Sequence, residues 1–91
     1  MRIRTYATLR DLLGTSAITL SLPGRVEVRY VLDRLVEAYP SLGGKLWDVD
    51  GNWTGFVTVL LNGRSIEWLQ GLNTWVADED TLSLFPPVGG G

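Results

Sequence analysis

One segment near the middle of the chain has the period of an α-helix, and it limits the possible folds more than any other feature. Between residues 28 and 39 apolar side chains recur at every third or fourth position, so they share one face of a helix. These side chains are Val28, Val31, Leu32, Leu35, Val36 and Tyr39. Glu27 suits the first turn and Pro40 stops the helix, but no good N-cap precedes it. A single amphipathic helix in a chain of 91 residues must bury its apolar face against a sheet.

Two segments before the helix predict strands for that sheet. Residues 2–7 alternate between polar and apolar, and they lead into a short helical turn that Gly14 closes. Residues 17–22 alternate as well, with Ile18, Leu20 and Leu22 on one face and Thr19 and Ser21 on the other, as in a half-buried strand.

Three segments after the helix predict further strands. Residues 56–61 are rich in β-formers and apolar on both faces, which is typical of an inner strand. Asn62-Gly63 is a two-residue hairpin signal, so residues 64–68 are expected to return as the next strand. Residues 81–85 alternate and form the last strand.

The order of these elements predicts an α+β fold of the β-grasp (ubiquitin-like) type. We expect a mixed sheet of four or five strands packed on one main helix. The domain is expected over residues 1–87, followed by a flexible C-terminal glycine tail over residues 88–91. Seven side chains are expected to be buried between helix and sheet: Ile18, Leu20, Val31, Leu32, Leu35, Leu82 and Leu84.

Composition argues against several classes of function. The net charge of −2 and the lack of a basic run argue against nucleic acid or an anionic membrane as a partner. Apolar runs are short and no apolar segment stands at the start, so we expect a cytoplasmic protein. The chain has no Cys and no His, which leaves it without a thiolate nucleophile, a common metal ligand or the usual general base. The acidic run at residues 78–80 reads as a turn, so a stand-alone enzyme is disfavoured.

The last residues have a composition that suits a different kind of chemistry. Pro86 and Pro87 stiffen the exit from the last strand and project the end of the chain away from the domain. Glycines have no Cβ, so a narrow channel of a partner can close around their backbone. This arrangement suits the delivery of the Gly91 carboxylate into another protein's active site, although a glycine tail without function has the same composition.

Several motifs resemble one family along nearly the whole chain. Residues 84–91, Leu-Phe-Pro-Pro-Val-Gly-Gly-Gly, resemble the ending of the small subunit of molybdopterin synthase and of related ubiquitin-like sulfur carriers. Further matches lie at residues 10–14, 35–40, 59–63 and 77–80. Because these patterns occur in the family's order, they make the resemblance more specific than the tail alone.

The resemblance implies that the chain is a carrier and not an enzyme. In this family a ubiquitin-activating-type enzyme adenylates the terminal glycine, and a sulfur donor then displaces AMP to leave a thiocarboxylate. Gly91 would bear the sulfur here, and Gly90 and Gly89 would thread the partner's channel. The chain itself would bind no cofactor and no metal, since ATP is used by the activating partner. The catalytic residues would lie on a large partner subunit.

The resemblance and the strand alternation together predict a docking face. Leu84 points inward, so Phe85 points to the opposite face of the sheet, and Tyr6 shares that face if the first and last strands are neighbours. By the same alternation Ile3 faces the core. The predicted partner-binding residues are Tyr6, Arg10, Ile66, Trp68, Phe85, Pro86, Pro87 and Val88. The expected partners are the adenylating enzyme and either the large subunit of molybdopterin synthase or another sulfur acceptor.

Two departures from the family pattern are present; the first should be tolerated, and the second leaves the acceptor open. Gly89 stands where relatives more often have Ala or Thr, and residues 47–55 lengthen the connection after the helix. The longer connection resembles archaeal carriers and the carrier of cysteine biosynthesis, whereas thiamine-type carriers are shorter and lack the Phe-Pro-Pro approach. Four interpretations remain: a molybdopterin-synthase carrier, which ranks first, a carrier for cysteine biosynthesis or tRNA thiolation, a ubiquitin-like protein modifier, and a binding domain with incidental glycines.

Overall fold

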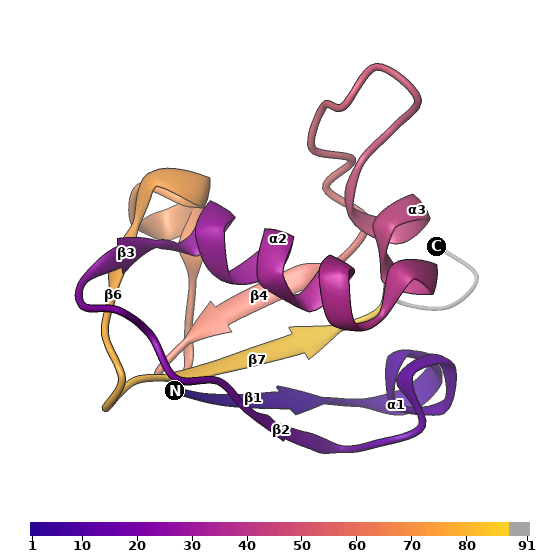
Figure 1. Cartoon of the computed structure of the whole chain (residues 1–91). Coiled ribbons are helices and arrows are strands. Elements are labelled where there is room, and N and C mark those ends of the chain that lie inside the picture. The colour runs from indigo at the N-terminus through magenta and orange to yellow at the C-terminus, as the bar shows by residue number, and fades with distance from the viewer. Residues whose placement is uncertain (88–91) are drawn as a thin grey trace.

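The computed structural model describes residues 1–87, and within them a mixed five-stranded sheet is covered on one face by one long helix (Figure 1). The sheet contains β1 (Arg2–Thr5), β2 (Ala17–Thr19), β4 (Thr58–Leu61), β5 (Arg64–Ser65) and β7 (Thr81–Phe85), in the order β2-β1-β7-β4-β5. Only the central pair β1 and β7 is parallel, and the other pairs are antiparallel. The predicted β-grasp architecture is confirmed.

The helices and a small second sheet complete the domain. The helices are α1 (Ala7–Leu13), α2 (Val28–Ala38) and α3 (Gly43–Leu46), with 3-10 turns η1 (Pro40–Leu42), η2 (Ile66–Trp68) and η3 (Gly71–Asn73). The second sheet pairs β3 (Val26–Glu27) with β6 (Trp75–Val76). The predicted tail over residues 88–91 lies outside the described residues.

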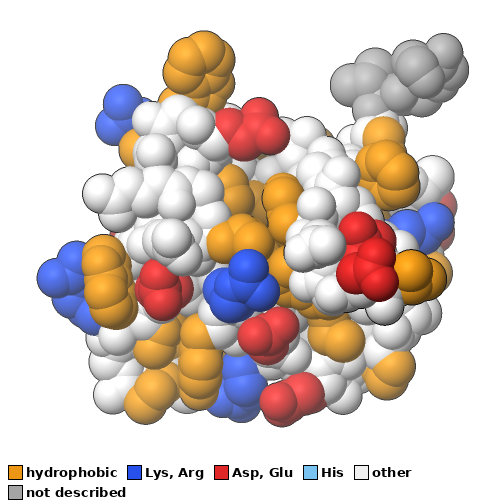
Figure 2. All heavy atoms as spheres, turned by 90° about the horizontal axis from the view of Figure 1, so that it is seen from above, with side chains coloured by type: hydrophobic (Ala, Val, Ile, Leu, Met, Phe, Trp, Pro, Cys, Tyr) orange, Lys and Arg blue, Asp and Glu red, His pale blue; other side chains and the backbone are white. Residues whose placement is uncertain are grey.

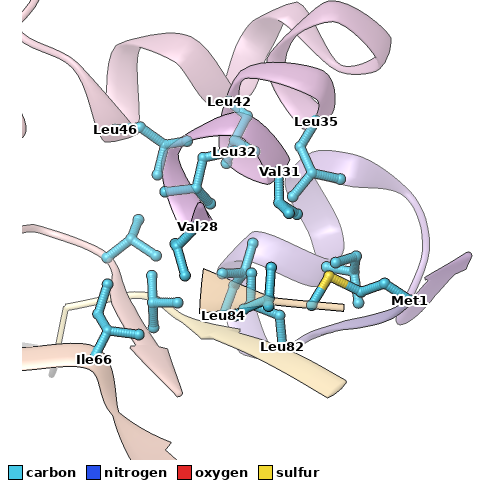
Figure 3. Close-up of a cluster of buried hydrophobic side chains, with 14 of the residues drawn as sticks. Met1, Val28, Val31, Leu32, Leu35, Leu42, Leu46, Ile66, Leu82 and Leu84 are labelled. Carbon is cyan, nitrogen blue, oxygen red and sulfur yellow. The ribbon is translucent and has the colours of Figure 1, made fainter. Parts of the chain in front are cut away.

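Helix α2 forms where the apolar period predicts it, and Figure 3 shows its buried side chains facing the sheet. Val28, Val31, Leu32 and Leu35 are buried against Leu82 and Leu84 of β7 and against Ile3 of β1. Glu27 precedes the helix as its N-cap residue and does not stand in its first turn. It makes no side-chain cap, in keeping with the lack of a good N-cap in the sequence, and the Val28 amide donates to the Thr74 carbonyl at 2.9 Å instead. Pro40 follows the end of the helix.

The connection after α2 closes one end of the core. Leu42 and Leu46 are fully buried, and Trp47 is half-buried. Beyond them the loop between α3 and β4 projects from the domain in Figure 1, with Trp47 and Trp53 bridged at its base.

Two of the seven predicted core residues are less buried than expected. Ile18 and Leu20 are only partly buried, because β2 is an edge strand that pairs with β1 alone and ends at Thr19. Leu22, beyond the strand, is buried instead.

The strand predicted for residues 64–68 is wrong after Ser65. Asn62 and Gly63 both have positive φ, 50° and 87°, as a two-residue hairpin turn requires. The Ser65 hydroxyl then accepts the amide of Glu67 and turns the chain into η2. The strand predicted to begin at residue 56 begins at Thr58.

Hydrogen bonds link the N-terminus and the segment after β2 to the turn that precedes β7. The Met1 amine donates to the Leu20 carbonyl at 2.6 Å and to Asp78 Oδ1 at 3.1 Å. The Leu22 amide also donates to Asp78 Oδ1, at 2.9 Å, and this bond, with the amine, lowers the pKa of Asp78 below its ordinary value of 3.8. The turn predicted for residues 78–80 is confirmed, and two of its carboxylates take part in hydrogen bonds that hold it.

Within the described residues, the helices are too short or too polar for any of them to cross a bilayer.

Candidate functional site

The last strand fixes the position of residues 85–87, from which the predicted tail continues; we call these residues the root of the tail. β7 lies between β1 and β4, and its Leu82 and Leu84 are fully buried. The strand ends at Phe85, beside α1 and α3 in Figure 1, where Pro86 is half-buried and Pro87 is exposed. The four residues predicted to act beyond this point, Val88, Gly89, Gly90 and Gly91, lie outside the described residues.

Two aromatic rings stack on the open face of the sheet where the tail begins. Tyr6 and Phe85 lie with their ring centroids 4.3 Å apart and their planes 3° from parallel. The register of the parallel pair brings them together, since Thr5 lies opposite Leu84 and the Tyr6 amide donates to the Leu84 carbonyl at 3.2 Å. This placement agrees with the strand alternation. The docking role of the two residues stays a prediction.

A groove lies on the other side of the tail root, between α1 and α3. It has a volume of about 480 Å³, and its apolar lining comes from Leu9, Leu12, Phe56, Val57, Pro86 and Pro87. Thr8, Asp11 and Lys45 supply polar atoms at its wall. Leu12 and Phe56 are 39% and 60% exposed, which is unusual for side chains of their size and type. The root of the tail is therefore flanked by two apolar surfaces.

Sequence reasoning missed this groove. The sequence assigned Phe56 to an inner strand, but the strand begins two residues later and leaves its ring exposed. Leu12 is exposed because Leu9 and Leu13, one turn apart on α1, occupy the buried face of that helix. The helical spacing of Leu9 and Leu13 was a usable signal for Leu12, whereas the meeting of α1 with Phe56 depends on tertiary structure.

The other predicted docking residues do not lie together on one surface. Arg10 is exposed on α1, one turn after Tyr6. Ile66 is only 3% exposed and belongs to the buried cluster in Figure 3, so its prediction as a contact residue is wrong. Trp68 is 86% exposed, but it lies on η2, which in Figure 1 lies near the start of α2, away from the end of β7. Of the predicted docking residues, Tyr6 and Phe85 therefore lie together near the root of the tail, whereas Ile66 and Trp68 do not.

The open face of the sheet carries positive charge beside the stacked rings. Arg2 and Arg4 alternate with the buried Ile3 and Thr5, so they share the outer face with Phe85. Within residues 1–87 neither arginine forms an ion pair. The opposite face, seen over α2 in Figure 2, mixes acidic, basic and hydrophobic side chains, with no continuous area of one charge sign in that view. The aromatic pair and the arginines together suit a partner surface with apolar and acidic groups.

The described part of the domain offers no group of side chains arranged to bind a metal ion: no three Asp or Glu residues of residues 1–87 come together in this way.

The comparisons with known proteins cover the chain from end to end. Small archaeal modifier protein 3 of Haloferax volcanii is 37% identical over 91 residues, which are 100% of this chain and 98% of that protein. Small archaeal modifier protein 1 of the same organism is 33% identical over 100% of both chains. The crystal structure of the latter has a TM-score of 0.88 to this fold at 33% identity, and the match covers 100% of this chain and 98% of that one. The sequence model of the ThiS family matches residues 3–91, and the chain therefore belongs to this family of ubiquitin-like sulfur carriers.

Proposed function

We propose that the chain carries sulfur on its last residue. In this proposal a ubiquitin-activating-type enzyme adenylates the Gly91 carboxylate, and a sulfur donor converts it to a thiocarboxylate. The observation that supports it most is the root of the tail, where a buried central strand ends between the Tyr6–Phe85 stack and the apolar groove. A domain with this arrangement holds a partner by its surface while the last residues enter that partner's active site.

The chemical logic of the proposal is a change of leaving group. A carboxylate is a poor electrophile, and transfer of AMP from ATP to Gly91 replaces a poor leaving group with a good one. Attack by sulfur then expels AMP, and the resulting thiocarboxylate is an ionised nucleophile that stays covalently attached to the chain. The domain's own residues bind and orient, while the adenylating residues and ATP belong to the partner.

We place the small-subunit role in molybdopterin synthase first among the acceptors. It rests on the resemblance of residues 84–91 to the ending of that subunit. The large subunit would then supply the catalytic residues. Carriers for cysteine biosynthesis or tRNA thiolation share the same activation and differ only in the acceptor. All of these reactions are expected in the cytoplasm.

A second candidate function is attachment of Gly91 to lysines of other proteins. The names of two relatives that match over the whole chain favour it, since both are called small archaeal modifier proteins. A modifier and a sulfur carrier share the adenylated glycine and differ in the nucleophile that attacks it.

The test is incubation of the full chain with a candidate activating enzyme, ATP and a sulfur donor, followed by intact-mass measurement. Sulfur carriage predicts a mass gain equal to the exchange of one oxygen for sulfur at the C-terminus. Modification predicts conjugates to added protein, which disappear when the target's lysines are blocked. If the chain neither releases AMP nor changes in mass with any enzyme of this type from its own cell, both proposals fail.

A further inference from the structure

Lys45 lies beside the root of the tail, and it is the only lysine in the chain. It belongs to α3, and Leu42 of η1 and Leu46 of α3, which precede and follow it in the sequence, are fully buried. The Thr54 hydroxyl donates to the Lys45 carbonyl at 2.8 Å and fixes the backbone further. The side chain is exposed and lines the same groove as Pro86 and Pro87. A fixed backbone thus holds one amine next to the point where the tail leaves the domain.

The amine of Lys45 is available, and the one other primary amine is not. Within residues 1–87 Lys45 makes no ion pair. The α-amine of Met1 is buried and donates to Leu20 and Asp78. Arginine side chains do not act as acyl acceptors at ordinary pH because they stay protonated. Lys45 is therefore the one exposed primary amine that an activated carboxyl group can meet on this domain.

We propose that Lys45 is a self-modification site, acylated by Gly91 of the same chain. The inference rests on the proposed function, because only an activated carboxyl group reacts with an amine. The Nζ lone pair attacks the carbonyl carbon of the Gly91 acyl-adenylate, and a C–N bond forms. The bond from that carbon to the adenylate oxygen breaks, AMP leaves with the electron pair, and the nitrogen loses its extra proton to water. The product is an isopeptide bond that closes a ring.

The spacing favours reaction within one chain over reaction between chains. Four residues follow Pro87 in the sequence, and a segment of that length spans at most about 14 Å. Pro87 and Lys45 line one groove, so the last described residue of the chain lies beside the same groove as the acceptor. Two groups joined by so short a segment of one chain can reach an effective concentration on the order of millimolar, which exceeds the micromolar concentration of a second copy. The closed form has no terminal carboxylate, so it neither carries sulfur nor modifies other proteins until an isopeptidase opens it.

The experiment uses the full chain with a C-terminal thioester on Gly91, prepared without any activating enzyme. Its outcome is therefore independent of whether a particular enzyme adenylates this chain. We expect a monomeric product that is lighter than the free acid by one water. Trypsin cuts the free acid after Lys45, whereas the closed form yields residues 35–64 joined to residues 65–91 as one branched peptide. Lys45→Arg keeps the charge and abolishes the product.

A second variant tests position and not only the presence of a lysine. Arg64 pairs with Leu61, which lies opposite Leu82 near the start of β7, so it is at the far end of the strand from Pro86. The double variant Lys45→Arg with Arg64→Lys keeps one lysine but moves it there. We expect its ring closure to be slower by at least about tenfold. Equal rates for the two proteins, hydrolysis alone in the wild type, or dimers whose formation depends on concentration would each overturn the proposal.

Discussion

The two ends of β7 differ in the surroundings of their polar and apolar groups. At the start of the strand the polar groups find partners within the chain. Asp78 accepts from Met1 and Leu22, and the Thr81 amide donates to the Asn62 side chain at 2.9 Å. Asp80 accepts the Ala77 amide at 2.8 Å.

The other end of the same strand leaves apolar groups without such partners. Phe85 stacks on Tyr6 at the open face, and Leu12 and Phe56 stay exposed around the groove. Exposed apolar groups that adjoin one another are typical of docking surfaces, whereas single ones need no explanation. The polar groups at the start of the central strand are thus paired within the chain, whereas its other end, where the predicted docking residues lie, leaves apolar groups exposed.

Removal of the last two residues should have the largest effect on function and almost none on the domain. Deleting Gly90 and Gly91 removes the carboxyl group that is activated, so AMP-forming turnover with the activating enzyme should be lost completely. The melting temperature should stay nearly unchanged, because both residues lie beyond the strand that carries the core contacts. The measurements are ATP-dependent pyrophosphate release and thermal unfolding. Turnover of ATP by the shortened protein would show that Gly91 is not the reactive residue.

Truncation of the core should weaken both ends of β7 together. Leu35 of α2 is fully buried in the core cluster that also contains Leu82 and Leu84 of β7, and Leu35→Ala removes apolar contacts and leaves a cavity. We expect the free energy of unfolding to fall by about 2–5 kcal/mol in chemical denaturation.

The matched control for this variant is Leu12→Ala, at an exposed leucine of the groove. It should change the free energy of unfolding by less than about 0.5 kcal/mol, as surface substitutions usually do, while it weakens partner binding. Equal destabilisation by the two variants would contradict the division between a buried core and an exposed groove.

The parts of the fold that the sequence predicts well are those with a long repeated pattern or a strong local signal. Helix α2 follows from six apolar residues on one face, and the hairpin follows from Asn62-Gly63. β3 and β6 have two residues each, which is too short for any alternation to register. Ile66 was placed on a strand because nothing before it breaks the pattern, but Ser65 turns the chain by a side-chain hydrogen bond.

The candidate site likewise has one part that the sequence predicts and one part that it does not. Alternation along two strands was enough to place Tyr6 and Phe85 on one face, once β1 and β7 were taken as neighbours. The groove joins Leu12, Phe56 and Lys45 from three separate segments, and no spacing in the sequence relates them. Such a surface depends on how α1 and α3 pack at the end of the sheet, which local patterns do not encode.

Loss of the aromatic ring at the tail root should weaken partner binding by an intermediate amount. Phe85→Ala removes one ring of the stack, and we expect the affinity for the activating enzyme to fall by about 1–3 kcal/mol, as for a central aromatic anchor. Isothermal calorimetry with the purified enzyme measures the change, and circular dichroism checks that the fold remains.

The control is Trp68→Ala, which removes a larger exposed ring from η2. It should leave the affinity unchanged, because η2 lies away from the end of β7 in Figure 1. Weaker binding of the Trp68 variant with normal binding of the Phe85 variant would move the docking face to the other end of the molecule.

The smallest expected effect concerns the closed end of the strand and depends on pH. The Leu22 amide and the Met1 amine lower the pKa of Asp78 in the folded state below its ordinary value of 3.8, so the ionised carboxylate favours folding. This contribution is fully present above that ordinary value and is lost as the pH falls through the lower pKa of the folded state. Asp78→Asn should therefore lower the melting temperature slightly at neutral pH, and the difference from the wild type should disappear in acid.

Glu79→Gln makes the same change of charge at a neighbouring exposed residue for which residues 1–87 provide no hydrogen bond, and it should show no such pH dependence. Both variants should bind the activating enzyme like the wild type, because the charge is removed at the end of β7 that is closed by the chain's own groups. A loss of affinity in Asp78→Asn at unchanged stability would mean that this end of the strand also contacts the partner.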